Sequence, residues 1–166
     1  MHGHAPAIVD SAKCDLAAEV LRESGSLRLR ATGSSMLPSI WPGDVLIIQK
    51  RELEQIAAGE TAVFFPGGRM TAHRVVSHHG SFLVTQGDSV PQPDAPVTAE
   101  NLLGVVVSIE RGGKLFAPAL RPGLMARCTA AVLRRSEFAM RVWLRVHLLF
   151  SPTSLKMVSP NLTASS

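Results

Sequence analysis

The chain has 166 residues, which is the size of one compact domain with a short appendage and excludes a multidomain assembly. Hydrophobic residues make up 46% and charged residues 18% of the sequence, so the chain can bury a core and global disorder is excluded. The net charge of +4 is uneven, because residues 1–120 carry 10 Lys/Arg against 12 Asp/Glu and residues 121–166 carry 7 against 1.

The first expected element is one short amphipathic helix. Asp10 and Ser11 are residue types that cap helices, and Leu16, Val20 and Leu21 recur after them at helical spacing. Gly25 follows as a stop signal.

From Leu27 onward the sequence changes to short apolar runs separated by Gly and Pro. This pattern predicts a mostly β, antiparallel domain. The expected strands are Leu27–Thr32, Asp44–Gln49, Thr61–Phe65, His73–Ser77, Phe82–Thr85 and Leu103–Ile109.

A basic helical segment and a polar end are expected after the β region. Pro118 and Pro122 precede the helical pattern of Leu124–Phe150, and the last residues are rich in Ser, Thr and Pro. The expected organisation is a helical segment (1–26), a catalytic β domain (27–120), a basic amphipathic helix (121–150) and a flexible tail (151–166).

Simple sequence features bear on the compartment and on the roles of the two cysteines. No apolar run is long enough to span a membrane, since Ala130–Phe150 is interrupted by four arginines, and no basic leader with an apolar stretch opens the chain. We therefore expect a cytoplasmic protein, with peripheral attachment to the inner face of the membrane as an option. Cys14 and Cys128 lack metal-ligand spacing, so we expect buried apolar residues rather than a disulfide or metal pair.

The segment from Gly33 to Asp44 carries the first candidate for chemistry. Ser35 stands before Met-Leu-Pro in a turn, and Gly43-Asp44 leads into a buried-strand pattern. A serine held at such a turn beside a rigid sheet can act as a nucleophile if a base is near. Taken alone, this motif is also compatible with an ordinary turn.

Two further stretches supply a possible base and carboxylates. His73 lies in a strand pattern whose alternation places it on the face opposite Arg74, from which it can reach the Ser35 turn. Asp88 and Asp94 lie in a Gly/Pro-rich loop. Each residue also has an ordinary structural interpretation, His73 as a strand-end imidazole and Asp88 and Asp94 as residues that cap the loop.

Together these three stretches resemble the type I signal peptidases and their self-cleaving repressor relatives. In that superfamily the nucleophile motif reads Gly-x-Ser-Met-x-Pro followed by Gly-Asp, as in residues 33–44. The base precedes Arg-Val and is Lys in most bacterial members but His in the archaeal and endoplasmic-reticulum branch, which His73-Arg74-Val75 matches. That branch also has a Gly-Asp turn with a second Asp six residues later, matching Asp88 and Asp94.

The resemblance implies a signal-peptidase-like β domain and a serine endopeptidase that cleaves an extended peptide or leader through an acyl-enzyme. Ser35 would be the nucleophile and His73 the general base, without a metal or other cofactor. Asp94 matches the third member and Asp88 the turn, although the reverse assignment stays open.

Substrate contacts are also implied. The oxyanion would meet the backbone N–H of Ser35 and a group of Ser34 or Gly33; some relatives have a hydroxyl at the position of Gly33, which lacks one. The side chains expected to line apolar subsites for small residues are those of Met36, Ile40 and Phe64, with the substrate adding as a strand against Thr61–Phe65.

Other functions stay open at this stage. A non-catalytic peptide-binding or membrane-adaptor module could have the same fold, and a self-cleaving regulator would need an effector domain before the site. The arginines of residues 121–150 suit either a helix packed on the β domain or one lying on an anionic membrane surface. A nucleic-acid partner is not expected, because no reader motif accompanies the basic residues.

Overall fold

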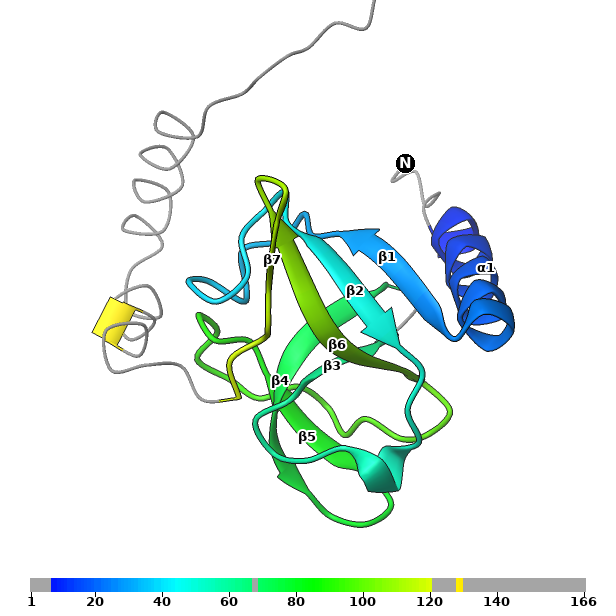
Figure 1. The fold of residues 1–166 in the computed structure, drawn as a ribbon. Helices are drawn as coiled ribbons and strands as arrows, with labels where there is room; N and C mark the ends of the chain where they lie inside the picture. Colours follow the sequence, from blue (N-terminus) through cyan, green and yellow to red (C-terminus); the bar gives the residue numbers. More distant parts are fainter. Residues whose placement is uncertain (1–6, 67–68, 121–127, 130–166) are drawn as a thin grey trace, which may run out of the picture. The chain divides into compact units, whose positions relative to one another are not determined.

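The computed structural model describes residues 7–66, 69–120 and 128–129, with the side chains of the first helix described from Asp15 on. Helix α1 (Ala7–Ser24) opens the chain, and a single 3-10 turn, η1 (Leu53–Gln55), lies between the second and third strands (Figure 1). The strands are β1 (Ser26–Arg30), β2 (Val45–Gln49), β3 (Thr61–Phe64), β4 (Thr71–His78), β5 (Leu83–Gln86), β6 (Leu102–Arg111) and β7 (Lys114–Phe116).

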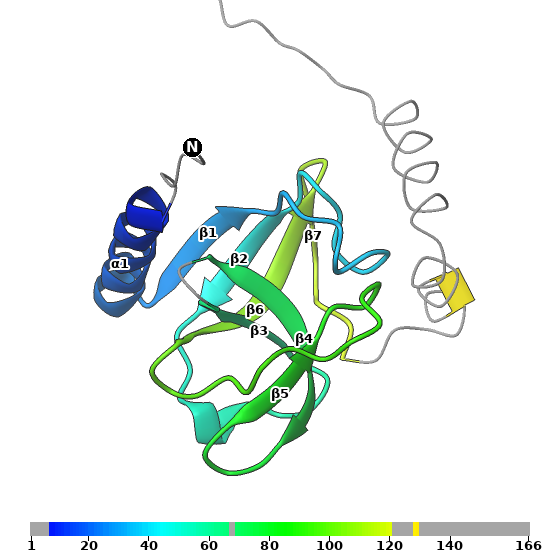
Figure 2. The same cartoon turned by 180° about the vertical axis from the view of Figure 1, so that it is seen from behind.

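These strands form one antiparallel sheet in the order β1-β2-β6-β3-β4-β5, with β7 paired to the end of β6. The mostly β class predicted from the sequence is therefore confirmed, and all six predicted strands are present with shifted ends. Helix α1 lies beside β1 (Figures 1 and 2).

Two local predictions differ from the structure. Asp10 and Ser11 lie inside α1 and do not cap it, because the helix-compatible residues before them extend the helix toward the N-terminus. The predicted stop is confirmed, since Gly25 adopts a φ of 69° and its N–H donates to the carbonyl of Leu21. Strand β7 was not predicted; it follows a turn in which Gly112 and Gly113 both have positive φ.

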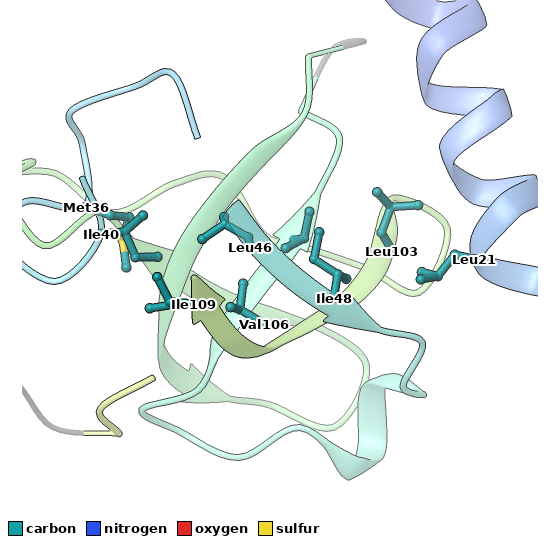
Figure 3. Packing of buried hydrophobic residues seen from close by; sticks show 9 residues of the cluster. Leu21, Met36, Ile40, Leu46, Ile48, Leu103, Val106 and Ile109 are labelled. Atoms are coloured by element: carbon teal, nitrogen blue, oxygen red, sulfur yellow. The ribbon is translucent and has the colours of Figure 1, made fainter. Parts of the chain in front are cut away.

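Apolar residues cover both faces of the sheet. One cluster joins α1, the segment after Ser35 and strands β2, β3 and β6, and Figure 3 shows Met36 and Ile40 in it. The second lies on the other face and includes Phe64, Val75 and Val105. Because side chains alternate along a strand, β3 contributes Val63 to the first cluster and Phe64 to the second.

The predictions for the C-terminal segment concern residues that lie largely outside the described part of the chain. Cys128 is described and is exposed, so the prediction that it is buried was wrong. Cys128 comes after the last strand and belongs to neither of the two core clusters that the strands build. Among the described residues, no helix has the length and apolar character needed to cross a membrane.

Candidate active site

Ser35 lies in the loop that joins β1 to β2. The ends of this loop are fixed by two backbone hydrogen bonds, from Ala31 N to Asp44 O (2.8 Å) and from Gly43 N to Ala31 O (2.7 Å). Immediately after Ser35, the side chains of Met36 and Leu37 are buried. The apolar anchors hold the loop against the sheet while Ser35 stays partly exposed.

His73 is a buried residue of β4, and its ring lies next to Ser35. Its Nε2 atom is 2.8 Å from the Ser35 Oγ. The ring also makes an edge contact with Phe64, at 6.2 Å between ring centroids and an interplanar angle of 68°. Strand pairing with Ala62 on β3 sets the backbone position of His73.

Asp94 lies on the other side of the same imidazole ring. Its Oδ2 atom is 2.7 Å from His73 Nδ1 and accepts a second hydrogen bond of 2.7 Å from the Thr85 hydroxyl. The backbone N–H of Asp94 donates to the Thr85 carbonyl at 2.8 Å. Thr85, which sequence reasoning did not single out, therefore fixes both the backbone and the carboxylate of Asp94.

The three residues Ser35, His73 and Asp94, called the Ser–His–Asp array below, form one hydrogen-bonded series. A carboxylate that accepts from Nδ1–H leaves Nε2 without a proton, so that Nε2 can accept the serine hydroxyl proton. Of the two carboxylates that the sequence left open, Asp94 is the one in contact with the imidazole.

Asp88 has a different set of partners. Its two carboxylate oxygens accept hydrogen bonds of 2.8 Å each from Nε and Nη2 of Arg74, and the Ser39 hydroxyl donates to Oδ2 at 2.5 Å. Both side chains of the Arg74–Asp88 pair are largely buried, with 12% and 6% exposed. Asp88 therefore joins the loop after β5 to β4 and to the Ser35 loop.

A second ion pair, buried on its carboxylate side, holds the other end of the Ser35 loop. Asp44 is 3% exposed, and Arg111 at the end of β6 donates to it through Nε (2.8 Å) and Nη2 (2.6 Å). The same carboxylate accepts from the backbone N–H of Trp41 at 2.7 Å, and Arg111 also donates to the Ser39 carbonyl at 3.3 Å. Ser39 thus lies between the two ion pairs.

A groove of about 370 Å³ opens beside the Ser–His–Asp array. The residues that line it include the segments 29–33, at and after the end of β1, and 69–73, before and at the start of β4. The apolar side chains that line it belong to Leu29, Ala31, Met36, Ile40, Leu46, Ile48, Val63, Met70 and Ala72. Met36 and Ile40 are among these groove-lining residues, and their contact with a substrate stays a prediction.

Two predictions about this groove were wrong. Phe64 does not line it, because alternation along β3 turns Val63 toward the groove and Phe64 into the core on the other face. The segment Thr61–Phe65 offers no free edge to a substrate, since β3 pairs with β4 on one side and with β6 on the other. Strand order, which the sequence did not reveal, decides both points.

Gly33 and Ser34, the residues predicted to assist the oxyanion donor, differ in their surroundings. Gly33 lines the groove, and a Cβ atom there would meet nothing within 4 Å. The carbonyl of Ser34 accepts from the Ser89 hydroxyl at 2.9 Å and from the backbone N–H of Leu37 at 3.2 Å. These bonds tie the residue before Ser35 to the loop that follows β5.

His79, just after β4, lies outside the Ser–His–Asp array and has its own partners. The ring of His79 stacks on Phe82 at 4.9 Å, and its Nε2 is 2.9 Å from the Ser77 hydroxyl. Within the described part of the chain, no group of three or more His, Cys, Asp or Glu residues could hold a metal ion.

Comparison with known proteins gives one family. The model of the family described as Peptidase S24-like matches residues 4–107. The match contains Ser35, His73 and Asp94. It also contains the Arg74–Asp88 pair and Asp44, while Arg111 lies after its last residue. No curated protein matches the chain.

Proposed function

Because the chain belongs to the Peptidase S24-like family, we propose that it is a serine endopeptidase of the signal-peptidase type that cleaves an extended peptide or leader segment. The observation that carries the proposal is the Ser–His–Asp array, with hydrogen-bonding distances of 2.8 Å and 2.7 Å on the two sides of His73.

The proposed reaction follows acyl transfer. His73 Nε2 accepts the proton of the Ser35 hydroxyl as Oγ attacks the scissile carbonyl carbon, and the imidazolium then gives this proton to the leaving amine. The acyl-enzyme is hydrolysed when His73 removes a proton from water and returns it to Ser35. Asp94 holds the imidazole tautomer and stabilises its charged form.

The proposed oxyanion donor is the backbone N–H of Ser35, assisted by Gly33 or Ser34. Gly33 leaves open space beside the nucleophile, and the carbonyl of Ser34 is held by Ser89 and Leu37. Fixed backbone donors stabilise a developing oxyanion without reorganising in the transition state.

The substrate is proposed to bind as a strand between β1 and β4. Ala31 exchanges both of its backbone hydrogen bonds with residues 43 and 44, so by alternation the polar backbone groups of Arg30 and Thr32 face the other, unpaired edge. On the opposite side of the groove, β5 pairs with β4 only from Arg74 onward, which leaves the edge before Arg74 available for strand addition.

Labelling with a fluorophosphonate probe tests the proposed chemistry. We expect the native chain to be labelled at Ser35, with no labelling of Ser35→Ala and greatly slowed labelling of His73→Ala. Ser81→Ala, in the exposed turn after β4, is the matched control and should be labelled normally. A folded native chain that the probe does not label would instead indicate the non-catalytic adaptor.

A second measurement separates cleavage of other peptides from self-cleavage. The purified chain is incubated with a peptide library and the new N-termini are mapped by mass spectrometry. Cleavage of library peptides that Ser35→Ala does not produce supports the endopeptidase. Cleavage confined to its own chain, at a rate independent of concentration, would indicate a self-cleaving regulator.

A further inference from the structure

The groove beside the Ser–His–Asp array has an uncompensated positive charge at one end. Arg30 and Arg69 both line the groove and both are exposed, and no Asp or Glu is among the described residues that line it. Arg69 has no ion-pair partner among the described residues, and the hydrogen bond of Arg30 goes to the neutral carbonyl of Gly43.

Two carboxylates of the strands and loop beside the groove are already engaged. Glu110 pairs with Arg28, and Asp44 is held by Arg111. A carboxylate of a bound molecule would therefore meet no competition from these two acids for Arg30 and Arg69.

Strand direction places the two arginines at the same end. Strands β1 and β4 are separated by β2, β6 and β3, and every neighbouring pair is antiparallel, so β1 and β4 run in the same direction. Arg30 precedes Ser35 by five residues and Arg69 precedes His73 by four. Because Ser35 and His73 are in contact, both arginines lie on the same side of the reacting groups.

The distance along the chain from Arg69 to His73 gives the expected position of the acid in the substrate. Arg69 lies two residues before Thr71, the first residue of β4. Four residues of extended chain correspond to about 13 Å, and a peptide added beside this segment has nearly the same rise per residue. A substrate side chain opposite Arg69 is therefore about four residues from the cleaved bond. Substrate side chains that point to the groove floor meet apolar groups such as Met36, Ile40 and Val63.

We infer that the preferred substrate, given the proposed peptidase function, is an extended peptide that combines apolar residues with an Asp or Glu about four residues from the scissile bond. The apolar side chains fill the floor of the groove, and the carboxylate pairs with Arg69 and is attracted by Arg30. An exposed pair of this kind contributes enough to change kcat/KM about two- to five-fold.

An acid scan in matched peptides tests this inference. Each peptide has an apolar, extended core with one Glu moved through every position on both sides of the cleaved bond, and Gln in the reference series. We expect Glu to raise kcat/KM about two- to five-fold over Gln at the position about four residues away, and the gain to shrink at high salt. Equal rates for Glu and Gln at all positions would overturn the inference.

Reversing the charge of Arg69 tests whether this residue causes the preference for an acidic side chain. Arg69→Gln should remove most of the gain, and Arg69→Glu should make Lys better than Glu at the same position. Lys50→Glu changes the net charge by the same amount as Arg69→Glu, but Lys50 does not line the groove. This substitution should leave the preference for Glu over Gln unchanged. An equal loss of the preference in Lys50→Glu would show a general charge effect and overturn the role of Arg69.

A binding measurement distinguishes a failure of this inference from a failure of the proposed peptidase function. Fluorescence anisotropy of the same labelled peptides with Ser35→Ala needs no cleavage. Tighter binding of the Glu peptide, lost in Ser35→Ala/Arg69→Gln, supports the acidic preference even if the native chain cleaves nothing. Cleavage with no difference between Glu and Gln in either rate or binding leaves the peptidase in place and rejects the preference.

Discussion

A Cβ atom on Gly87 would lie 2.7 Å from the carbonyl oxygen of Ser35 and 3.1 Å from His73 Nε2. The loop after β5 therefore approaches the nucleophile and the base so closely that only a residue without a side chain fits. Ser89, two residues further on, donates its backbone N–H to the same Ser35 carbonyl at 2.9 Å. The loop that ends at Asp94 thus also sets the separation of Ser35 and His73.

Gly87→Ala is expected to disable the site more than it destabilises the fold. The added methyl group must push the Ser35 backbone and the imidazole apart, which breaks the hydrogen bond between them. We expect labelling by the fluorophosphonate probe to slow at least about 100-fold, since a displacement of about 1 Å can have an effect of this size. Circular dichroism should show a folded chain.

Gly112→Ala is the matched control for this prediction. Gly112 has a φ of 57° in the turn between β6 and β7, and a Cβ atom there would meet nothing within 4 Å. The substitution introduces backbone strain of about 1–2 kcal/mol without touching the site. Normal labelling of Gly87→Ala would contradict the steric argument.

Asp94→Asn should reveal which carboxylate orients His73. The Thr85 hydroxyl and His73 Nδ1 both contact Oδ2 of Asp94. An amide that places its NH₂ group at this position donates to Nδ1 and to the Thr85 hydroxyl oxygen, which favours the tautomer with the proton on Nε2. Ser35 would then lose its proton acceptor, and the rate of acylation is expected to fall about 10⁴-fold. Asp88→Asn leaves the imidazole contacts in place and should slow acylation less than about ten-fold. A larger loss in Asp88→Asn than in Asp94→Asn would reverse the two roles.

The Arg74–Asp88 pair is expected to contribute to folding stability. Asp88→Ala leaves the guanidinium of Arg74 buried and unpaired, which costs about 3–5 kcal/mol. Urea unfolding followed by circular dichroism measures this loss as a lower midpoint. Replacing both residues by apolar ones, Arg74→Met with Asp88→Leu, should recover part of it.

The exposed pair Arg28–Glu110 gives the comparison for that experiment. Its side chains are 60% and 30% exposed, so Glu110→Gln should cost less than about 1 kcal/mol. Similar losses in Asp88→Ala and Glu110→Gln would mean that burial does not strengthen the Arg74–Asp88 pair.

The sequence predicted the strands well because their apolar runs are bounded by Gly and Pro. It missed β7 because Lys114–Phe116 is a strand of three exposed residues with no buried face to produce a pattern. It also predicted a free edge on β3, which is paired on both sides. Which strands neighbour β3 depends on pairing between residues far apart in the chain, such as Ala62 and Val105.

The candidate site was predictable to the extent that its residues fall within short motifs. Ser35 and His73 fall within such motifs. For Asp88 and Asp94, which share one loop, the resemblance favoured Asp94 as the partner of His73 and left the reverse open, until the fold showed which of them contacts the imidazole. Thr85 and Arg111 were missed. Arg111 lies 67 residues from Asp44, and a lone arginine at the end of a strand has no local signal for an ion pair with a buried carboxylate.

The basic C-terminal segment leads to the last prediction. Residues 121–166 carry seven Lys/Arg against one acid, and each basic residue near an anionic leaflet contributes about 1 kcal/mol of attraction. We expect the full chain to sediment with liposomes that contain anionic lipid, less so with neutral liposomes, and progressively less as salt screens the charges. The truncated comparison should end at Leu120, because the carbonyl of Ala119 accepts a 2.6 Å hydrogen bond from Arg74. Equal sedimentation of both chains with anionic liposomes would reject a membrane role for the segment. Binding that is abolished by moderate salt would indicate electrostatic attachment, whereas binding that persists would indicate insertion of apolar side chains such as Trp143 and Phe150.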